Sequence, residues 1–354
     1  MDNYLEHTQK IMPRRIGFAC KWIDRPDQVD SIKPKDDCKQ YNTMTTTVAW
    51  LNRQTREVAE QKLWDLMVYN IEANRKLVER VGALDDHLKM VRIGSDILPC
   101  YTEPSWNYFW RQGDVIRYAE DAFRKVGDLA RHHGVRLSMH PGQFTVLASD
   151  RPDVVERAID EFEYHSTMAA WMGYGQRFQD FKINVHISGK KGPQGIRDVY
   201  PRLSPEARNT ITIENEEISY GLDDCLTLGD LLPIVLDIHH HWIKSGGEYI
   251  SPTDARIQMV VDSWRGTRPT MHYSVSREDC LVGHSATSSP DFKNLLLEGH
   301  NRQKLRAHSD FMWNQEVNAW ALGHLVWADI MVEAKAKNLA SFELAKQAQT
   351  LGLI

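Results

Sequence analysis

The strongest constraint on this chain is an alternation of short apolar runs with long amphipathic stretches, repeated along most of its 354 residues. Eight of the runs have the length and the aliphatic content of strands. They are residues 15–20 (RIGFAC), 90–94 (MVRIG), 136–139 (RLSM), 182–187 (KINVHI), 211–215 (ITIEN), 233–238 (PIVLDI), 270–274 (TMHYS) and 329–333 (DIMVE). Most are continuously apolar, which is typical of parallel strands that helices cover.

Segments with helical periodicity lie between the runs, at residues 44–82, 114–133, 153–173, 223–231, 252–264 and 334–350. Right-handed crossovers place each such helix outside a closing parallel sheet. The alternation therefore predicts an α/β fold, a (β/α)₈ TIM barrel in a single domain. We expect the barrel to span residues 14–345 after an N-terminal extension, 1–13. Residues 97–113 and 275–328 form long connections.

The composition is that of a soluble globular protein, with 42% apolar and 26% charged residues. No apolar run approaches the roughly 18–20 residues that a membrane span needs, and the first fifteen residues do not resemble a secretory signal. The five scattered cysteines indicate reduced thiols rather than a disulfide framework. The net charge of -5 argues against a non-specific nucleic-acid coat. It is compatible with carboxylates that gather around metal ions.

Ionisable side chains lie where the predicted strands end. In a TIM barrel the active site lies at the carboxyl ends of the strands. Every predicted strand except the first carries a group of metal-ligand type there: Asp96, His140, His186, Glu214, Asp237 with His239 to His241, His272 and Glu333. One such residue alone is more often a hydrogen-bonded or loop-capping group, but several buried together are costly without cations. The set predicts a site for several ions, and imidazole with carboxylate suits manganese, zinc or iron(II).

The three consecutive histidines after Asp237 leave one ligand open. Simple alternation along a strand places His239 on the same face as Asp237. Geometry at the end of a strand often breaks this alternation, so spacing alone does not choose between the histidines.

Nine short segments resemble the UV damage endonuclease family, and they occur in the family's order over nearly the whole chain. They are residues 15–20 (RIGFAC), 91–99 (VRIGSDILP), 136–149 (RLSMHPGQFTVLAS), 184–189 (NVHISG), 212–217 (TIENEE), 235–241 (VLDIHHH), 271–274 (MHYS), 307–310 (AHSD) and 332–335 (VEAK). A single HPG or ENEE segment would be weak evidence for the family, whereas nine segments in the family's order are specific to it.

The resemblance implies a ligand set: His140, His186, Glu214, Asp237, His240, His272, His308 and Glu333. It favours His240 over His239, and it adds His308, which lies in a predicted loop. Asp96 stands where some members have a further active-site histidine. Glu214, Asp96, His272 and His308 are the residues we expect to take part in catalysis, with Glu214 bridging ions. Thr270 stands where some members have a carboxylated lysine, so a carbamate ligand is excluded at that position.

The resemblance also implies contacts with DNA. Family members use a glutamine and an aromatic residue after HPG to probe the damaged duplex, and these are Gln143 and Phe144 here. An exposed amide and ring can wedge into the base stack where nucleotides are flipped out. Phe18 stands where relatives can have tyrosine. From the residues themselves, Lys190, Lys191 and Arg277 are further candidates for contact with DNA.

The function that the resemblance implies is hydrolysis of duplex DNA immediately 5′ of UV photoproducts. Two or three divalent ions would serve it, Mn²⁺ first, with Zn²⁺ or Mg²⁺ as alternatives. We expect a monomer that acts on damaged double-stranded DNA in the cytoplasm, associated with the nucleoid. The alternatives are an abasic-site endonuclease like endonuclease IV, and a metal-dependent sugar isomerase or epimerase on the same barrel.

Overall fold

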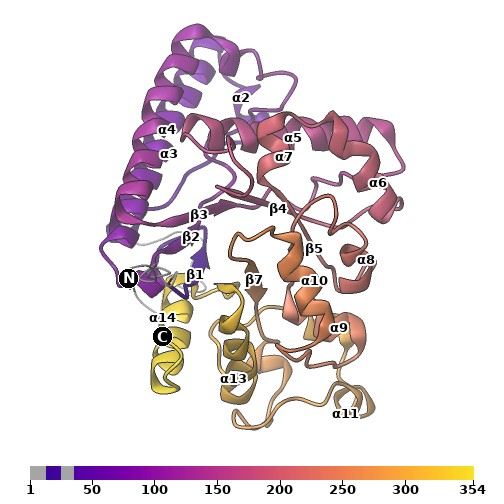
Figure 1. Cartoon of the computed structure of the whole chain (residues 1–354). Coiled ribbons are helices and arrows are strands. Elements are labelled where there is room, and N and C mark those ends of the chain that lie inside the picture. Colours follow the sequence, from indigo (N-terminus) through magenta and orange to yellow (C-terminus); the bar gives the residue numbers. More distant parts are fainter. Residues whose placement is uncertain (1–12, 25–35) are drawn as a thin grey trace, which may run out of the picture.

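Eight parallel strands form one sheet in the computed structural model, which describes residues 13–24 and 36–354 (Figure 1). The strands are β1 (Ile16–Ala19), β2 (Met90–Arg92), β3 (Arg136–Met139), β4 (Lys182–His186), β5 (Ile211–Glu214), β6 (Ile234–Val235), β7 (Thr270–Tyr273) and β8 (Asp329–Val332). Their order in the sheet is β6-β5-β4-β3-β2-β1-β8-β7. Chain neighbours are therefore sheet neighbours throughout, as in a barrel.

The two edges of the sheet meet at one point. A parallel bridge joins Asp237, just after β6, to His272 in β7. There the His272 amide donates to the carbonyl of Leu236 at 3.0 Å. The barrel thus closes through two residues of the predicted metal site, and the predicted (β/α)₈ fold is confirmed.

Helices surround the strands. They are α1 (Asp36–Lys39), α2 (Val48–Leu51), α3 (Arg56–Gly82), α4 (Gly113–His133), α5 (Pro152–Trp171), α6 (Gly192–Val199), α7 (Pro205–Thr210), α8 (Leu222–Leu226), α9 (Ile238–Ser245), α10 (Ala255–Ser263), α11 (Phe292–Leu297), α12 (Arg302–Leu305), α13 (Gln315–Gly323) and α14 (Lys337–Thr350). Short 3₁₀ turns are η2 (Asp86–Leu88), η3 (Phe109–Arg111), η4 (Tyr200–Arg202), η5 (Glu278–Cys280) and η6 (His324–Val326).

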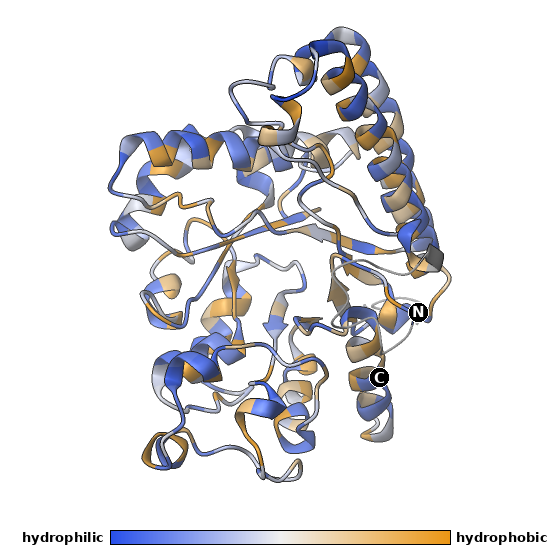
Figure 2. Cartoon of the chain, turned by 180° about the vertical axis from the view of Figure 1, so that it is seen from behind, coloured by the Kyte–Doolittle hydropathy of each residue, from blue (hydrophilic) through white to orange (hydrophobic). Residues whose placement is uncertain are grey.

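The long helices are amphipathic and pack side by side. Figure 1 shows α3 and α4 adjacent along one side of the molecule, and Figure 2 shows hydrophilic and hydrophobic residues alternating along them. Local sequence sets their ends. The Thr55 side chain caps the start of α3, and Gly134, with φ 67°, ends α4 in the left-handed conformation that glycine adopts without strain. No helix among the described residues is long and apolar enough to cross a membrane.

Some predicted boundaries were wrong. The predicted helix 44–82 is two helices, because Thr55 caps a new helix start after α2 ends at Leu51. The predicted sixth strand is only Ile234–Val235, because Asp237 caps α9 and turns the chain into a helix. The last helix ends at Thr350, as the predicted segment 334–350 does, and the barrel limits 14–345 stay a prediction. Most of the expected N-terminal extension, residues 1–12, lies outside the described residues.

The opposite, amino-terminal end of the barrel is closed by a charge cluster. Asp329, at the start of β8, is fully buried and pairs with Arg136 and Arg268, each at 2.7 Å. Its Oδ1 also accepts the backbone amide of Arg15 at 3.0 Å. One carboxylate therefore connects the beginnings of β1, β3, β7 and β8.

Candidate metal centre

Glu214, the last residue of β5, lies at the centre of the carboxyl-end cluster. It is fully buried. Its Oε2 lies 3.4 Å from His140 Nε2, 4.0 Å from His186 Nε2 and 3.1 Å from His272 Nδ1. These imidazoles come from the residue after β3, the end of β4 and the middle of β7. Residues far apart in the sequence thus converge on one carboxylate, as the strand ends predicted.

Asp237 and His240 enter the cluster through the start of α9. Asp237 Oδ1 accepts the amide of His240 at 2.7 Å, which is the helix cap. His240 Nδ1 faces the carbonyl of Asn215 at 3.0 Å and lies 3.4 Å from Glu214 Oε1. The contact with the carbonyl keeps a proton on Nδ1, so Nε2 becomes the lone-pair donor when the ring is neutral.

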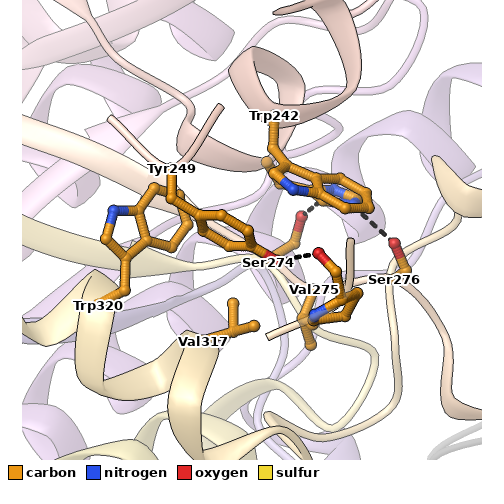
Figure 3. Close-up of a pocket in the computed structure, with 9 residues that line it drawn as sticks. Trp242, Tyr249, Ser274, Val275, Ser276, Val317 and Trp320 are labelled. Carbon is orange, nitrogen blue, oxygen red and sulfur yellow. Dashed lines mark hydrogen bonds between the residues drawn. The ribbon is translucent and has the colours of Figure 1, made fainter. Parts of the chain in front are cut away.

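His239 is directed elsewhere, so the geometry favours the expected choice of His240. The Nδ1 of His239 lies 2.9 Å from Ser274 Oγ, and its Nε2 lies 3.2 Å from Ser276 Oγ. Both ring nitrogens are therefore engaged. The ring borders a cavity of about 20 Å³ whose walls include Trp242, Tyr249 and Trp320 (Figure 3). His239 belongs to this wall and not to the ligand cluster.

Glu333 and His308 complete the cluster on the side of β8. Glu333 Oε1 lies 3.3 Å from His272 Nδ1, and Glu333 Oε2 lies 3.9 Å from His308 Nδ1. Arg92 of β2 donates to Glu333 through its Nη1. The backbone bridge between Ser276 and His308 fixes the loop that carries His308. The loop residue that the resemblance implied therefore does reach the cluster.

Three buried polar atoms of this cluster have no hydrogen-bond partner: Glu214 Oε1, Asp237 Oδ2 and His272 Nδ1. Such orphans are rare, because each costs roughly 1–3 kcal/mol when left unsatisfied. All three belong to expected ligands. Ligand atoms within 4.8 Å of one another form two groups, His140 with His186 and Glu214, and Glu214 with Asp237 and His272. The residues present therefore fit two divalent cations that share Glu214.

Three of the imidazoles are in the form that binds metal. Burial lowers the pKa of His272 to about 4, and it also lowers the pKa of His186 and His308. They are neutral near pH 7 and offer lone pairs. His240 differs. Burial lowers its pKa, but the carboxylates of Asp237 and Glu214 outweigh burial and raise it to about 9. Burial raises the pKa of Asp237.

Sequence reasoning missed two cations beneath the cluster, Lys182 and Arg92. Lys182 is buried at the start of β4, and its Nζ lies 2.9 Å from His272 Nε2. Burial lowers the pKa of this lysine to about 7. The signal was present in the sequence. Lys182, Asn184 and His186 alternate with Ile183 and Val185, so the three polar residues share one face of β4. Asn184 on that face donates to Glu214 Oε2.

Two expected site residues lie away from the cluster. Phe18 is 1% exposed and packs edge-on against Trp22 at 5.8 Å, so the expectation that it contacts DNA was wrong and it is a core residue. Asp96 is exposed near the start of the long connection that follows β2. The charge of Asp96 acts to raise the pKa values of Glu161 and His165. Asp96 is in neither of the two ligand groups. A role for Asp96 as ligand or base stays a prediction.

The expected DNA-probing pair lies on the loop that begins at His140. Gln143 is exposed, and Phe144 is 84% exposed. Both residues lie in a turn at the surface, which the hydrogen bond from the Thr145 amide to the carbonyl of Gly142 closes at 2.9 Å. Among the basic candidates, Lys190 pairs with Asp150 at 2.8 Å and Arg277 with Asp279 at 2.6 Å, while Lys191 is exposed.

A buried carboxylate ringed by imidazoles at the carboxyl end of a TIM barrel defines the class as metal-binding barrel proteins. The comparison with known families is more specific. The model of the family described as UV-endonuclease UvdE matches residues 14–354, so the chain belongs to this family and is an endonuclease, a hydrolase that acts on DNA. The resemblance to this family, which nine short sequence segments indicated, is confirmed.

Similar proteins agree with this assignment. The UV DNA damage endonuclease of Bacillus mycoides (strain KBAB4) is 26% identical over 322 residues, 87% of this chain and 89% of that protein. The UV-damage endonuclease of Schizosaccharomyces pombe is 28% identical over 346 residues, 94% of this chain and 50% of that longer protein. The crystal structure of SacUVDE superposes with a TM-score of 0.71 at 20% identity, over 96% of this chain and all of that one. Endonuclease IV from Thermus thermophilus shares the fold, with a TM-score of 0.51 at 13% identity, over 78% of this chain and 94% of that one.

Proposed function

We propose that this protein is a metal-dependent DNA repair endonuclease that hydrolyses duplex DNA immediately 5′ of UV photoproducts. The observation that carries the metal dependence is the set of orphaned buried atoms on Glu214, Asp237 and His272. They belong to one cluster, and divalent cations would satisfy all three. Family membership supports the substrate, since its named relatives act on UV-damaged DNA.

The ligand assignment follows from the two groups. His140, His186 and Glu214 would hold one ion, and Glu214, Asp237 and His272 would hold a second. His240 lies near Glu214, Glu333 near His272 and His308 near Glu333, and these three residues would complete the shells or hold a third ion. Oxygen and imidazole ligands without thiolate support Mn²⁺, with Zn²⁺ or Mg²⁺ as alternatives. When bound, the ions would supply a nucleophile at neutral pH and stabilise the charge on the phosphate.

The chain's own residues perform the remaining tasks. Glu214 would connect the ions, because its carboxylate belongs to both groups of ligands. Its Oε2 lies near His140 and His272, one from each group, and its Oε1 lies near His240. Asn184 orients that carboxylate by donating to Oε2. Gln143 and Phe144 would insert into the base stack next to the lesion, because both are held out on a turn beside His140. Lys190, Lys191 and Arg277 would contact the DNA backbone. The monomeric state and the cytoplasmic, nucleoid-associated location stay predictions.

The test uses a duplex with one cyclobutane pyrimidine dimer, a duplex with one abasic site and an intact duplex of the same sequence. With Mn²⁺, the protein should cut the dimer-containing strand immediately 5′ of the lesion, and a chelator should abolish cutting. Glu214→Gln should lose incision and bound Mn²⁺ together. Glu120→Gln, on the exposed face of α4, is the matched control and should retain both. Preference for the abasic duplex would instead favour an activity like that of endonuclease IV.

A further inference from the structure

Lys337, the first residue of α14, is a cation at the rim of the cluster without an anionic partner. It forms no ion pair and no side-chain hydrogen bond within residues 13–24 and 36–354. The side chain is half-buried. Its backbone has φ 51°, in the left-handed region that residues other than glycine seldom adopt. Strain of this kind persists where the surroundings enforce it and is concentrated at functional sites.

The surroundings of Lys337 carry groups of both signs: Glu333 and Cys20 raise its pKa, and two cations lower it. The groups that act on it electrostatically are Cys20, Arg92, Glu333 and Lys21. They come from the ends of three neighbouring strands, since β1 lies between β2 and β8 in the sheet. Cys20 also has positive φ, 71°, and its amide donates to the Arg92 carbonyl at 2.7 Å, which joins the ends of β1 and β2.

The one carboxylate that acts on Lys337 is already engaged. Glu333 forms its ion pair with Arg92, so the Lys337 ammonium has no ion pair among the described residues. Arg92 also has a buried Nε without a partner. This corner borders the ligand cluster, because Glu333 Oε1 is 3.3 Å from His272 Nδ1. The Lys337 ammonium is therefore free to donate to an anion that binds beside the cluster.

We infer that Lys337 is a phosphate-binding residue that donates to a non-bridging oxygen of the phosphodiester in the active site. This inference rests on the proposed function. A phosphodiester offers negatively charged non-bridging oxygens, and the unpaired ammonium of Lys337 is a compact donor for them. In TIM barrels the loops after strands seven and eight frequently form the phosphate site, and Lys337 follows β8.

The experiment compares Lys337→Met and Lys337→Gly with Lys346→Met, an exposed lysine on the same helix. Single-turnover incision of the dimer-containing duplex is measured with Mn²⁺. Binding of that duplex is measured with EDTA at several salt concentrations. Lys337→Met should slow incision by about 10²- to 10³-fold, as loss of one transition-state donor does. It should lower the slope of log affinity against log salt by about 0.9, one phosphate contact. Bound Mn²⁺ should be unchanged, and Lys346→Met should behave as the unmodified protein.

The glycine variant keeps the test decisive if the methionine variant does not fold. Glycine accepts positive φ without strain, so Lys337→Gly should melt above Lys337→Met yet show the same loss of incision. Normal incision and an unchanged salt slope in both variants would overturn the inference, as would loss of Mn²⁺. Failure of the unmodified protein to cut any duplex would instead refute the proposed function.

Discussion

Replacement of Asp237 by asparagine separates a structural role of this residue from a metal-binding one, because the two roles predict opposite changes in stability. Asn and Asp are equally good N-caps, so the hydrogen bond to the His240 amide that starts α9 is retained. The carboxylate charge is removed. In the metal-free protein that charge is unfavourable, since Asp237 is fully buried and its Oδ2 has no partner.

The sign and size follow from these contacts. Burial raises the pKa of Asp237 above its unfolded value, so ionisation at pH 8 destabilises the metal-free fold. Relief of one unsatisfied buried group is worth roughly 1–3 kcal/mol. With metal the sign reverses, because an ion at a thousand times its Kd stabilises by about 4.1 kcal/mol. The variant loses that contribution but keeps the gain of 1–3 kcal/mol, so its net loss is about 1–3 kcal/mol. At about 2 °C per kcal/mol for a chain of this size, the variant should melt about 2–6 °C higher in EDTA and about 2–6 °C lower with saturating Mn²⁺ than the unmodified protein.

Thermal melting at pH 8, with EDTA and across a Mn²⁺ titration, measures both quantities, and elemental analysis should find fewer ions bound to the variant. Asp291→Asn is the matched control, because Asp291 caps α11 through the Asn294 amide at 2.9 Å away from the cluster. It should change neither melting curve relative to the unmodified protein. Lower stability of Asp237→Asn in EDTA would refute the argument, since it would make the carboxylate a structural group that needs no ion.

Three further outcomes are expected. Gln143→Ala with Phe144→Ala should reduce the preference for dimer-containing over intact duplex by about tenfold or more while bound Mn²⁺ stays constant, since loss of one stacking contact costs about 1–3 kcal/mol; equal preference before and after the change would contradict the probing role. Asp329→Asn should destabilise the fold by about 3 kcal/mol, measured by urea unfolding, because it leaves buried guanidinium groups without their charge partner; a loss below about 1 kcal/mol would show that water already screens the cluster. Binding of Mn²⁺ should release a proton from His240, whose pKa is raised to about 9, so affinity should increase from pH 6 to 9; calorimetry in buffers of different ionisation enthalpy would detect no such proton if the ring is not a ligand.

The sequence predicted the strands and their catalytic ends well, for a physical reason. Parallel strands buried on both faces must be short apolar runs, and polar residues at their carboxyl ends stand out against them. All eight runs contain strands, and most of these have nearly the expected bounds. The helix starts were less visible, because Thr55 and Asp237 act through single side-chain hydrogen bonds that periodicity does not register.

The position of His240 shows where spacing alone reaches its limit. Along a strand, His239 would have shared a face with Asp237. In the first turn of α9 the side chains rotate by about 100° per residue, and His240 then faces Glu214 while His239 faces Ser274 and Ser276. The change from strand to helix at Asp237 therefore determines which of the two histidines faces the cluster. The resemblance had implied the same residue.

The inner face of β4 relates the fold to the chemistry. An alternating strand with Lys182, Asn184 and His186 on one face would be a poor core strand, since each polar group needs a partner once it is buried. Each finds one in the cluster: Lys182 reaches His272, Asn184 donates to Glu214, and His186 lies beside the same carboxylate. These partners are themselves expected ligands. The interior of the barrel at this level is therefore paired by charge and hydrogen bonds, and the atoms left over, Glu214 Oε1, Asp237 Oδ2 and His272 Nδ1, are those that only cations would satisfy. A chain without metal chemistry would gain stability by replacing these residues with apolar ones.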